Sequence, residues 1–181
     1  MLPPLVEKAL ALAERLGFER SCSPETGRLL QALAGQRGRT RVAEIGSGCG
    51  VGSAWLLAGL APGVPFVTVE PDDERADAVA RLLAGDESAR VLHGGWQELL
   101  PAEAPFDLLF ADGGGQPTKT DERLLGLLAP GGTILLDDLT PSRGLDGDPV
   151  RELWLRHERV TAVELQVSSR ESVILGTLQP R

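Results

Sequence analysis

The stretch Arg41-Val42-Ala43-Glu44-Ile45-Gly46-Ser47-Gly48-Cys49-Gly50 decides the fold. Its first half is rich in strand-forming residues, its second half alternates with glycine, and a helical pattern follows over 50–60. A strand that enters a glycine-rich turn and continues as a helix is typical of nucleotide-binding α/β folds. The spacing is G-x-G-x-G and not the dinucleotide pattern G-x-G-x-x-G, because Val51 and Ser53 stand where the last glycine would fall. The turn therefore favours a ligand without a pyrophosphate.

Strands and helices alternate along the rest of the chain. Hydrophobic patterning predicts strands at 66–70, 90–93, 106–111, 133–136, 161–167 and 173–178. Helices are expected at 5–16, 23–34, 72–84, 96–100, 121–128 and 149–157. The last two strands are joined by a short turn, so they must pair antiparallel. We therefore predict a Rossmann-like, doubly wound, mostly parallel seven-stranded sheet with a C-terminal antiparallel hairpin and helices on both faces.

Size and composition fit one domain. The chain has 181 residues, 42% of them hydrophobic, and we expect N-terminal helices in 1–35 and a cofactor-binding core in 36–181. The start of the chain lacks a basic region followed by an apolar core, and Cys22 and Cys49 are the only cysteines. Both features favour a cytoplasmic protein. The net charge of −8 argues against broad nucleic-acid binding.

Glu70 is the first candidate ligand-binding side chain. It ends a predicted strand twenty residues after Gly50. An acidic residue at this distance from the glycine turn can accept hydrogen bonds from both ribose hydroxyls of an adenosine group. The alternative is an exposed strand end with no ligand.

Three carboxylates follow two later strands. Asp112 comes after the strand 106–111, and Asp137 and Asp138 come after the strand 133–136. Ligands of open α/β sheets bind beyond the carboxyl ends of the strands. Clustered carboxylates suit a hard, oxygen-binding cation. The alternative is that one acid faces the cofactor and the others cap loops.

These segments carry a resemblance to a known family. The run 42–60 looks like the first motif of class I, S-adenosylmethionine-dependent methyltransferases. More narrowly, the chain resembles the metal-dependent O-methyltransferases of the catechol and caffeoyl-CoA type over about 21–178. The segments that carry this narrower likeness are Ser23-Pro24-Glu25-Thr26-Gly27, Val69-Glu70-Pro71-Asp72, Phe106-Asp107 with Ala111-Asp112, and Gly131-Gly132 through Asp137-Asp138.

The resemblance implies a cofactor site for S-adenosylmethionine. Its Gln97 would offer an amide to the adenine edge and Trp96 a flat wall, although Trp96 also fits a core aromatic residue. The residues assigned to this site are Glu44, Gly46, Ser47, Gly48, Gly50, Ser53, Glu70, Pro71, Gly94, Gly95, Trp96, Gln97 and Asp112.

The resemblance also implies a metal and a lysine. Mg²⁺ or Mn²⁺ would bind Asp112, Asp137 and Asp138, the last standing where the family has Asn. The family's lysine shortly after the first of these acids is replaced by glycines at 113–115. Lys119 is the nearest lysine, so we assign the catalytic roles to Asp112 and Lys119. The alternative for Lys119 is a solvated position on a helix surface.

The function implied is O-methylation of a small, hydroxylated, catechol-like acceptor with the assistance of a divalent metal. Two alternatives stay open: a related methyltransferase acting on another acceptor, such as a tRNA hydroxyuridine, and a non-catalytic S-adenosylmethionine-binding domain. We expect a small-molecule partner and no membrane, and the resemblance leaves room for a homodimer. The segment 142–148, with two glycines and three charges, fits either a substrate lid or an ordinary surface loop.

Overall fold

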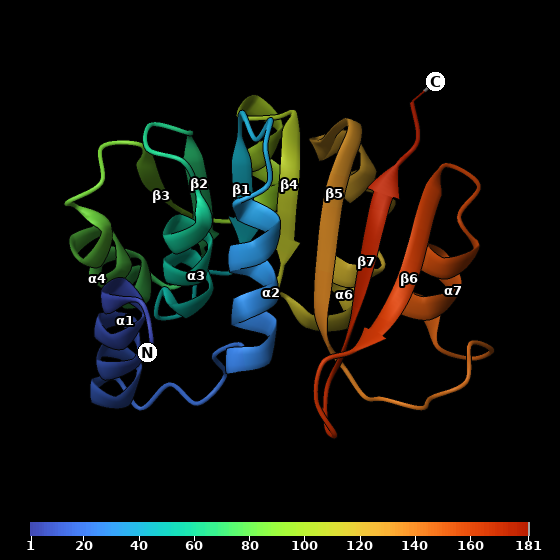
Figure 1. The fold of residues 1–181 in the computed structure, drawn as a ribbon, viewed down its shortest axis with the longest axis horizontal. Helices are drawn as coiled ribbons and strands as arrows, with labels where there is room; N and C mark the ends of the chain where they lie inside the picture. The colour runs from blue at the N-terminus through green and yellow to red at the C-terminus, as the bar shows by residue number, and fades with distance from the viewer. Residues whose placement is uncertain (181) are drawn as a thin grey trace.

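The structure, a computed structural model, describes residues 1–180 and consists of one seven-stranded sheet with helices on both faces (Figure 1). The strand order is β3-β2-β1-β4-β5-β7-β6. The strands are β1 (Val42–Ile45), β2 (Phe66–Glu70), β3 (Ala89–His93), β4 (Phe106–Ala111), β5 (Leu128–Leu139), β6 (Val160–Gln166) and β7 (Ser172–Leu178). The first five strands in this order, β3, β2, β1, β4 and β5, are parallel to one another. Strand β7 pairs antiparallel with both β5 and β6. The predicted sheet with its C-terminal hairpin is confirmed.

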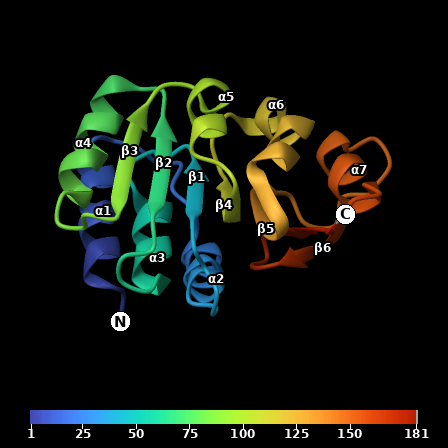
Figure 2. The same cartoon turned by 90° about the horizontal axis from the view of Figure 1, so that it is seen from above.

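Helices cover the two faces of the sheet in two groups (Figure 2). They are α1 (Pro4–Arg15), α2 (Pro24–Ala34), α3 (Val51–Gly59), α4 (Asp73–Leu83), α5 (Trp96–Leu99), α6 (Gly115–Lys119) and α7 (Pro149–Arg156), with 3₁₀ turns at Leu100–Ala102 and Glu122–Leu127. One buried cluster joins α1, α2, α3 and α4 to one face. A second cluster joins α5, α7 and both 3₁₀ turns to the other face. No helix within residues 1–180 has the length and apolar character needed to cross a bilayer.

Local signals place the helix ends. Ser23 caps α2 by accepting a hydrogen bond from the Thr26 amide at 3.2 Å, and Pro24 occupies the first helical position. Asp72 caps α4 in the same way, accepting from the Arg75 amide at 3.0 Å. The glycine turn therefore lies where the sequence indicated, and these caps set the starts of two helices.

Three details differ from the prediction. The segment expected as a helix at 121–128 is a 3₁₀ turn, because β5 begins immediately after it and leaves no room for a full α-helix. Strand β5 is much longer than the expected 133–136, since it is paired on both sides, by β4 and by β7. The short helix α6 had no counterpart in the sequence prediction, because its segment begins with glycine and contains proline.

Candidate active site

The glycine turn between β1 and α3 packs closely against neighbouring backbone and side chains. Gly46 has a φ of 87°, and a Cβ there would lie 2.4 Å from the Cα of Gly113. Gly48 has a φ of 51°, and its added Cβ would lie 2.7 Å from the ring of Phe18. A side chain at either position would both strain the turn and collide with its surroundings.

A cavity of about 310 Å³ opens above this turn. It is lined by six of the residues assigned to the cofactor from sequence: Gly46, Ser47, Gly48, Glu70, Pro71 and Asp112. The connection between α1 and α2 closes it from outside through four residues that the sequence reasoning missed: Phe18, Arg20, Ser21 and Cys22. They carry no motif of their own, and only their position before the cap of α2 could have indicated them.

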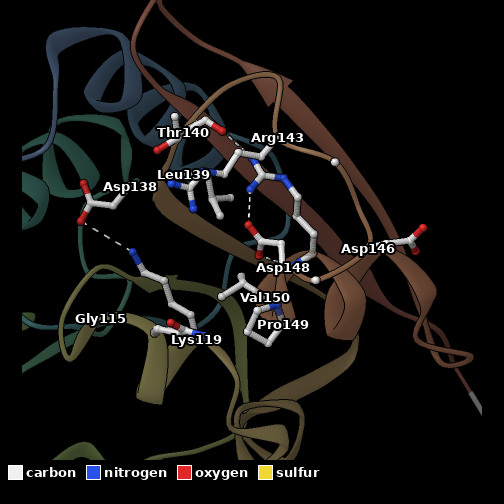
Figure 3. A pocket seen from close by; sticks show the side chains of 14 residues that line it. Gly115, Lys119, Asp138, Leu139, Thr140, Arg143, Asp146, Asp148, Pro149 and Val150 are labelled. Atoms are coloured by element: carbon white, nitrogen blue, oxygen red, sulfur yellow. Dashed lines mark hydrogen bonds and ion pairs between the residues drawn. The ribbon is translucent and has the colours of Figure 1, made fainter.

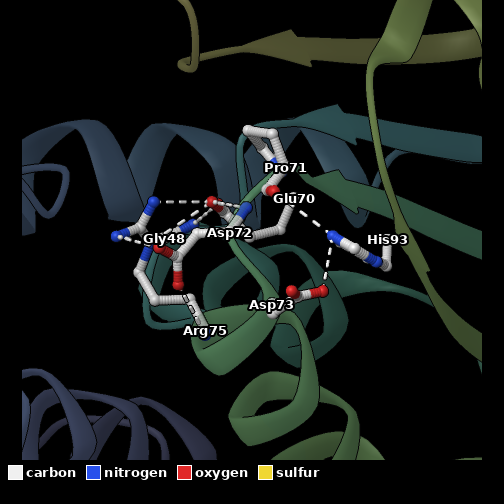
Figure 4. A network of polar contacts seen from close by, with 7 residues as sticks. All are labelled: Gly48, Glu70, Pro71, Asp72, Asp73, Arg75 and His93. Carbon is white, nitrogen blue, oxygen red and sulfur yellow. Dashed lines mark hydrogen bonds and ion pairs between the residues drawn. The ribbon is translucent and has the colours of Figure 1, made fainter.

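Glu70 is held rigidly at the wall of this cavity (Figure 4). Its Oε2 accepts a hydrogen bond from the Gly48 amide at 2.9 Å. Its Oε1 accepts from the Asp72 amide at 3.1 Å and from the Arg75 guanidinium at 2.8 Å. Arg75 in turn lies over the Phe18 ring, 5.3 Å from its centroid. The carboxylate therefore links the glycine turn, the end of β2 and the start of α4.

Glu44 and Ser53 lie behind the turn and do not line the cavity. Glu44 is fully buried, and its Oε2 accepts hydrogen bonds from the Ser53 hydroxyl and, at 2.8 Å, from Thr68. Burial raises the pKa of Glu44 to about 7. Gly50 is the N-cap of α3 and is also absent from the cavity wall. The structure thus places these three assigned residues in support of the turn: Glu44 is buried on β1, and Gly50 and Ser53 belong to the start of α3.

The loop assigned to adenine lies at the end of β3. Trp96 is buried in the core beneath the sheet, and its Nε1 donates to the Thr118 hydroxyl at 3.3 Å. The core alternative for Trp96 is therefore the one that the structure supports, since a buried ring is not free to form a wall. Gly94, Gly95 and Gln97 do not line the 310 Å³ cavity, and the adenine contact of Gln97 stays a prediction. His93 contacts Pro71 and Asp73 instead of the cavity (Figure 4).

The three predicted carboxylates meet at the carboxyl edge of the sheet. Strands β4 and β5 are parallel neighbours, and one carboxylate oxygen each of Asp112, Asp137 and Asp138 lies within 4.8 Å of the others. Asp137 is fully buried, and its Oδ2 has no hydrogen-bond partner within residues 1–180. Burial raises the pKa of Asp137 to about 7. Burial, and then the charges of Asp137 and Asp138, raise the pKa of Asp112 well above its usual value.

Lys119 is buried against these acids. Its Nζ donates to the Asp137 carbonyl oxygen at 2.8 Å and to Asp137 Oδ1 at 3.3 Å. It lies 3.6 Å from Asp138 Oδ2, as Figure 3 shows. The alternative of a solvated helix-surface lysine is therefore wrong. Helix α6 turns Lys119 inward, and the Trp154 indole donates to the Lys119 carbonyl oxygen at 2.7 Å, which holds the helix in place.

A second cavity, of about 450 Å³, lies next to Asp138 of the acid cluster (Figure 3). It shares Gly115 and Asp138 with the first cavity. Its walls come from α6, the loop after β5 and the start of α7, so the predicted loop 142–148 contributes directly to it. Arg151 closes its base: the side chain is buried and bonds to Asp148, to Glu164 and to the carbonyl oxygen of Thr140.

Comparison with known proteins identifies the family to which the chain belongs. A sequence profile described as a methyltransferase domain matches residues 43–139, which run from the glycine turn to the acid cluster. The chain belongs to this methyltransferase family. The predicted likeness to class I, S-adenosylmethionine-dependent methyltransferases is thereby confirmed. The match ends at the loop that lines the second cavity.

Relatives and solved structures agree with the family. A protein of Mycobacteroides abscessus, provisionally named an O-methyltransferase, is 33% identical over 136 residues, which are 70% of this chain and 62% of the relative. This chain therefore matches somewhat less than two thirds of the length of that relative. The O-methyltransferase TomG of Streptomyces achromogenes, solved with S-adenosylmethionine, superposes with a TM-score of 0.82 at 25% identity, covering 99% of this chain and 92% of TomG. An O-methyltransferase of Bacillus cereus shares the fold, with a TM-score of 0.82 at 24% identity and the same two coverages.

Proposed function

We propose that this protein transfers the methyl group of S-adenosylmethionine to a hydroxyl oxygen of a small, catechol-like acceptor with the assistance of a divalent metal. The observation that carries the proposal is the meeting of two cavities at one acid cluster. The smaller cavity lies over the glycine turn, the larger one lies under the loop after β5, and both reach Gly115 and Asp138. Donor and acceptor in these cavities would face each other across a shared wall, which is the arrangement that methyl transfer requires.

The smaller cavity suits the methyl donor. Glu70 lines it with a carboxylate whose position is set by the Gly48 amide and Arg75, and this carboxylate can accept from ribose hydroxyls. The hydroxyl oxygens of Ser21 and Ser47 are buried in its walls and have no hydrogen-bond partner within residues 1–180. A ligand with polar groups would satisfy them. The S-adenosylmethionine bound to the similar TomG supports this assignment.

The acid cluster suits a divalent cation. Asp137 Oδ2 is a buried oxygen without a partner in the described chain, and Asp112 and Asp138 present oxygens next to it. With all three acids ionised, the single positive charge of Lys119 leaves two negative charges uncompensated. Asp112, Asp137 and Asp138 would hold Mg²⁺ or Mn²⁺ there, since these ions prefer carboxylate oxygens. A bound cation of this kind lowers the pKa of a hydroxyl that it contacts.

Lys119 and α6 supply the remaining chemistry from the chain itself. The Lys119 ammonium is fixed at the border of the larger cavity by two oxygens of Asp137. It would donate a hydrogen bond to an acceptor oxygen and stabilise the charge that develops when that oxygen loses its proton. Glycines at 113–115 keep side chains out of the passage between the two cavities. The protein's part is thus to place an ionised oxygen in line with the methyl group and to exclude water.

Activity on catechol in the presence of S-adenosylmethionine tests this proposal. Transfer should stop with EDTA and return with Mg²⁺ or Mn²⁺. We expect Asp138→Asn to stay active, since an amide oxygen can still bind the cation, and Asp112→Ala to be inactive. Full turnover in EDTA would remove the metal from the mechanism. Binding of S-adenosylhomocysteine in calorimetry without turnover of catechol would favour another acceptor or a non-catalytic domain.

A further inference from the structure

The larger cavity has one charged side chain without an ion-pair partner in the described chain. Six charged residues line it, and five of them have an ion-pair partner. Lys119 pairs with Asp138 at 3.6 Å, Arg151 with Asp148 at 2.5 Å, and Asp146 with Arg156 at 2.5 Å. The sixth is Arg143, whose side chain makes no hydrogen bond and no ion pair within residues 1–180.

The backbone that presents Arg143 is in an unusual conformation. Within residues 1–180, Asp138 and Ser142 are the non-glycine residues with positive φ, at 55° and 61°. Asp138 lines the cavity and Ser142 directly precedes Arg143. L-residues avoid this region, and such conformations persist where the surrounding structure imposes them, often at ligand-binding segments. Both residues lie in the stretch that leads from the end of β5 to Arg143, so this stretch has an imposed backbone shape.

The base of the loop is tied down, while Arg143 remains free. Buried Arg151 holds the Thr140 carbonyl oxygen at 2.7 Å and the Asp148 carboxylate at 2.5 Å. These two contacts fix the loop ends and leave the exposed guanidinium of Arg143 at the rim of the cavity, where Figure 3 draws it among the lining residues. Besides Arg143, the wall holds two cations, Lys119 and Arg151, and three acids, Asp138, Asp146 and Asp148, and no aromatic residue lines it.

We propose that the methyl acceptor carries a carboxylate, which binds the guanidinium of Arg143 in the 450 Å³ cavity. This inference rests on the proposed function, because it takes this cavity as the acceptor site. An arginine fork matches a carboxylate with two parallel hydrogen bonds, and such charge-assisted pairs are stronger than neutral ones. The protein has a net charge of −8, so a free cation at the cavity also offsets the general repulsion of an anionic ligand.

Matched acids and amides test the inference. The probes are 3,4-dihydroxybenzoate and 3,4-dihydroxycinnamate, each compared with its neutral primary amide. We expect kcat/KM for the acids to exceed that for the amides by roughly tenfold in the native protein, the scale of a hydrogen-bonded charge pair. In Arg143→Gln this ratio should fall close to one, and in Arg143→Lys it should be intermediate. Arg37→Gln, which removes an exposed arginine outside both cavities, should keep the native ratio.

A binding measurement separates this inference from the proposed function. Calorimetry with protein saturated in S-adenosylhomocysteine should show the same roughly tenfold preference for acids, lost in Arg143→Gln and reduced by salt. If none of the four compounds is methylated but this preference holds, the proposed acceptor chemistry fails and the anion site stands. Equal affinity for acids and amides, an unchanged preference in Arg143→Gln, or no binding of either class would overturn the inference.

Discussion

The two cavities differ in what builds them. The smaller one is formed mainly by the glycine turn after β1 and by residues at the carboxyl ends of β2 and β4, and the connection between α1 and α2 closes it. The larger one is formed by the short helix α6, the loop after β5 and the start of α7. The family profile matches residues 43–139, which include the glycine turn and stop where that loop begins. On the proposed assignment, a shared donor would bind at the ends of regular strands while the acceptor site varies on a loop, which is how a common scaffold serves different substrates.

The largest effect should come from Gly48→Val, which attacks the cavity built on regular elements. The new Cβ would collide with the Phe18 ring at 2.7 Å and occupy a positive φ, so the turn must move. We expect binding of S-adenosylhomocysteine to be abolished in calorimetry while circular dichroism shows a folded protein. Gly85→Val is the control, since no heavy atom lies within 4 Å of its added Cβ. Normal binding by Gly48→Val would mean that the donor does not use this turn.

Lys119→Met tests the boundary between the two cavities. It removes the cation that contacts Asp137 and leaves a buried carboxylate uncompensated. We expect the free energy of unfolding, measured in EDTA, to fall by about 3 kcal/mol, the scale for breaking a buried ion pair. Added Mg²⁺ should recover part of this loss. Lys8→Met is a matched control, because Lys8 is exposed on α1 and is the only other lysine in the chain. Equal effects of the two substitutions would contradict the placement of Lys119.

Glu70→Ala affects only the smaller cavity. Loss of the carboxylate should weaken S-adenosylhomocysteine binding by about 1.5–3 kcal/mol, the range for hydrogen bonds to a charged group. Affinity for an acceptor such as 3,4-dihydroxybenzoate should change much less, since Glu70 does not line the larger cavity. Glu74→Gln, at an exposed position in the first turn of α4, serves as the control. An unchanged donor affinity in a folded Glu70→Ala protein would rule out the ribose assignment.

The smallest effect should come from Trp154→Phe, which loosens α6 without touching either ligand. It removes the 2.7 Å hydrogen bond to the Lys119 carbonyl oxygen and leaves that buried oxygen without this donor. The free energy of unfolding should fall by about 1–2 kcal/mol. Because α6 carries Lys119, we also expect kcat on catechol to fall more than donor affinity does. An equal change in both would show that Trp154 supports the fold as a whole and not the position of Lys119.

The sequence alone determined the sheet and the turn that lines the smaller cavity, which we propose takes the donor. Strand and helix alternation and the glycine turn are local signals, so they can be identified without knowing what packs against them. Parallel topology then dictated that Asp112, Asp137 and Asp138 meet at one edge, because the carboxyl ends of neighbouring parallel strands lie together. The sequence also indicated Glu70, although its contact with Arg75 comes from the cap geometry of α4.

Only the tertiary structure decided the larger cavity, which we propose takes the acceptor. The glycines and proline around 113–117 gave no helical signal, yet packing against two tryptophans forms α6 and turns Lys119 toward Asp137. Trp96 looked available as a wall for adenine, but burial beneath the sheet places it in the core. Arg143 is one exposed arginine among many in the sequence, and only the pairing of every other charge in its cavity distinguishes it. Such features depend on contacts between residues far apart in the chain, which no local pattern encodes.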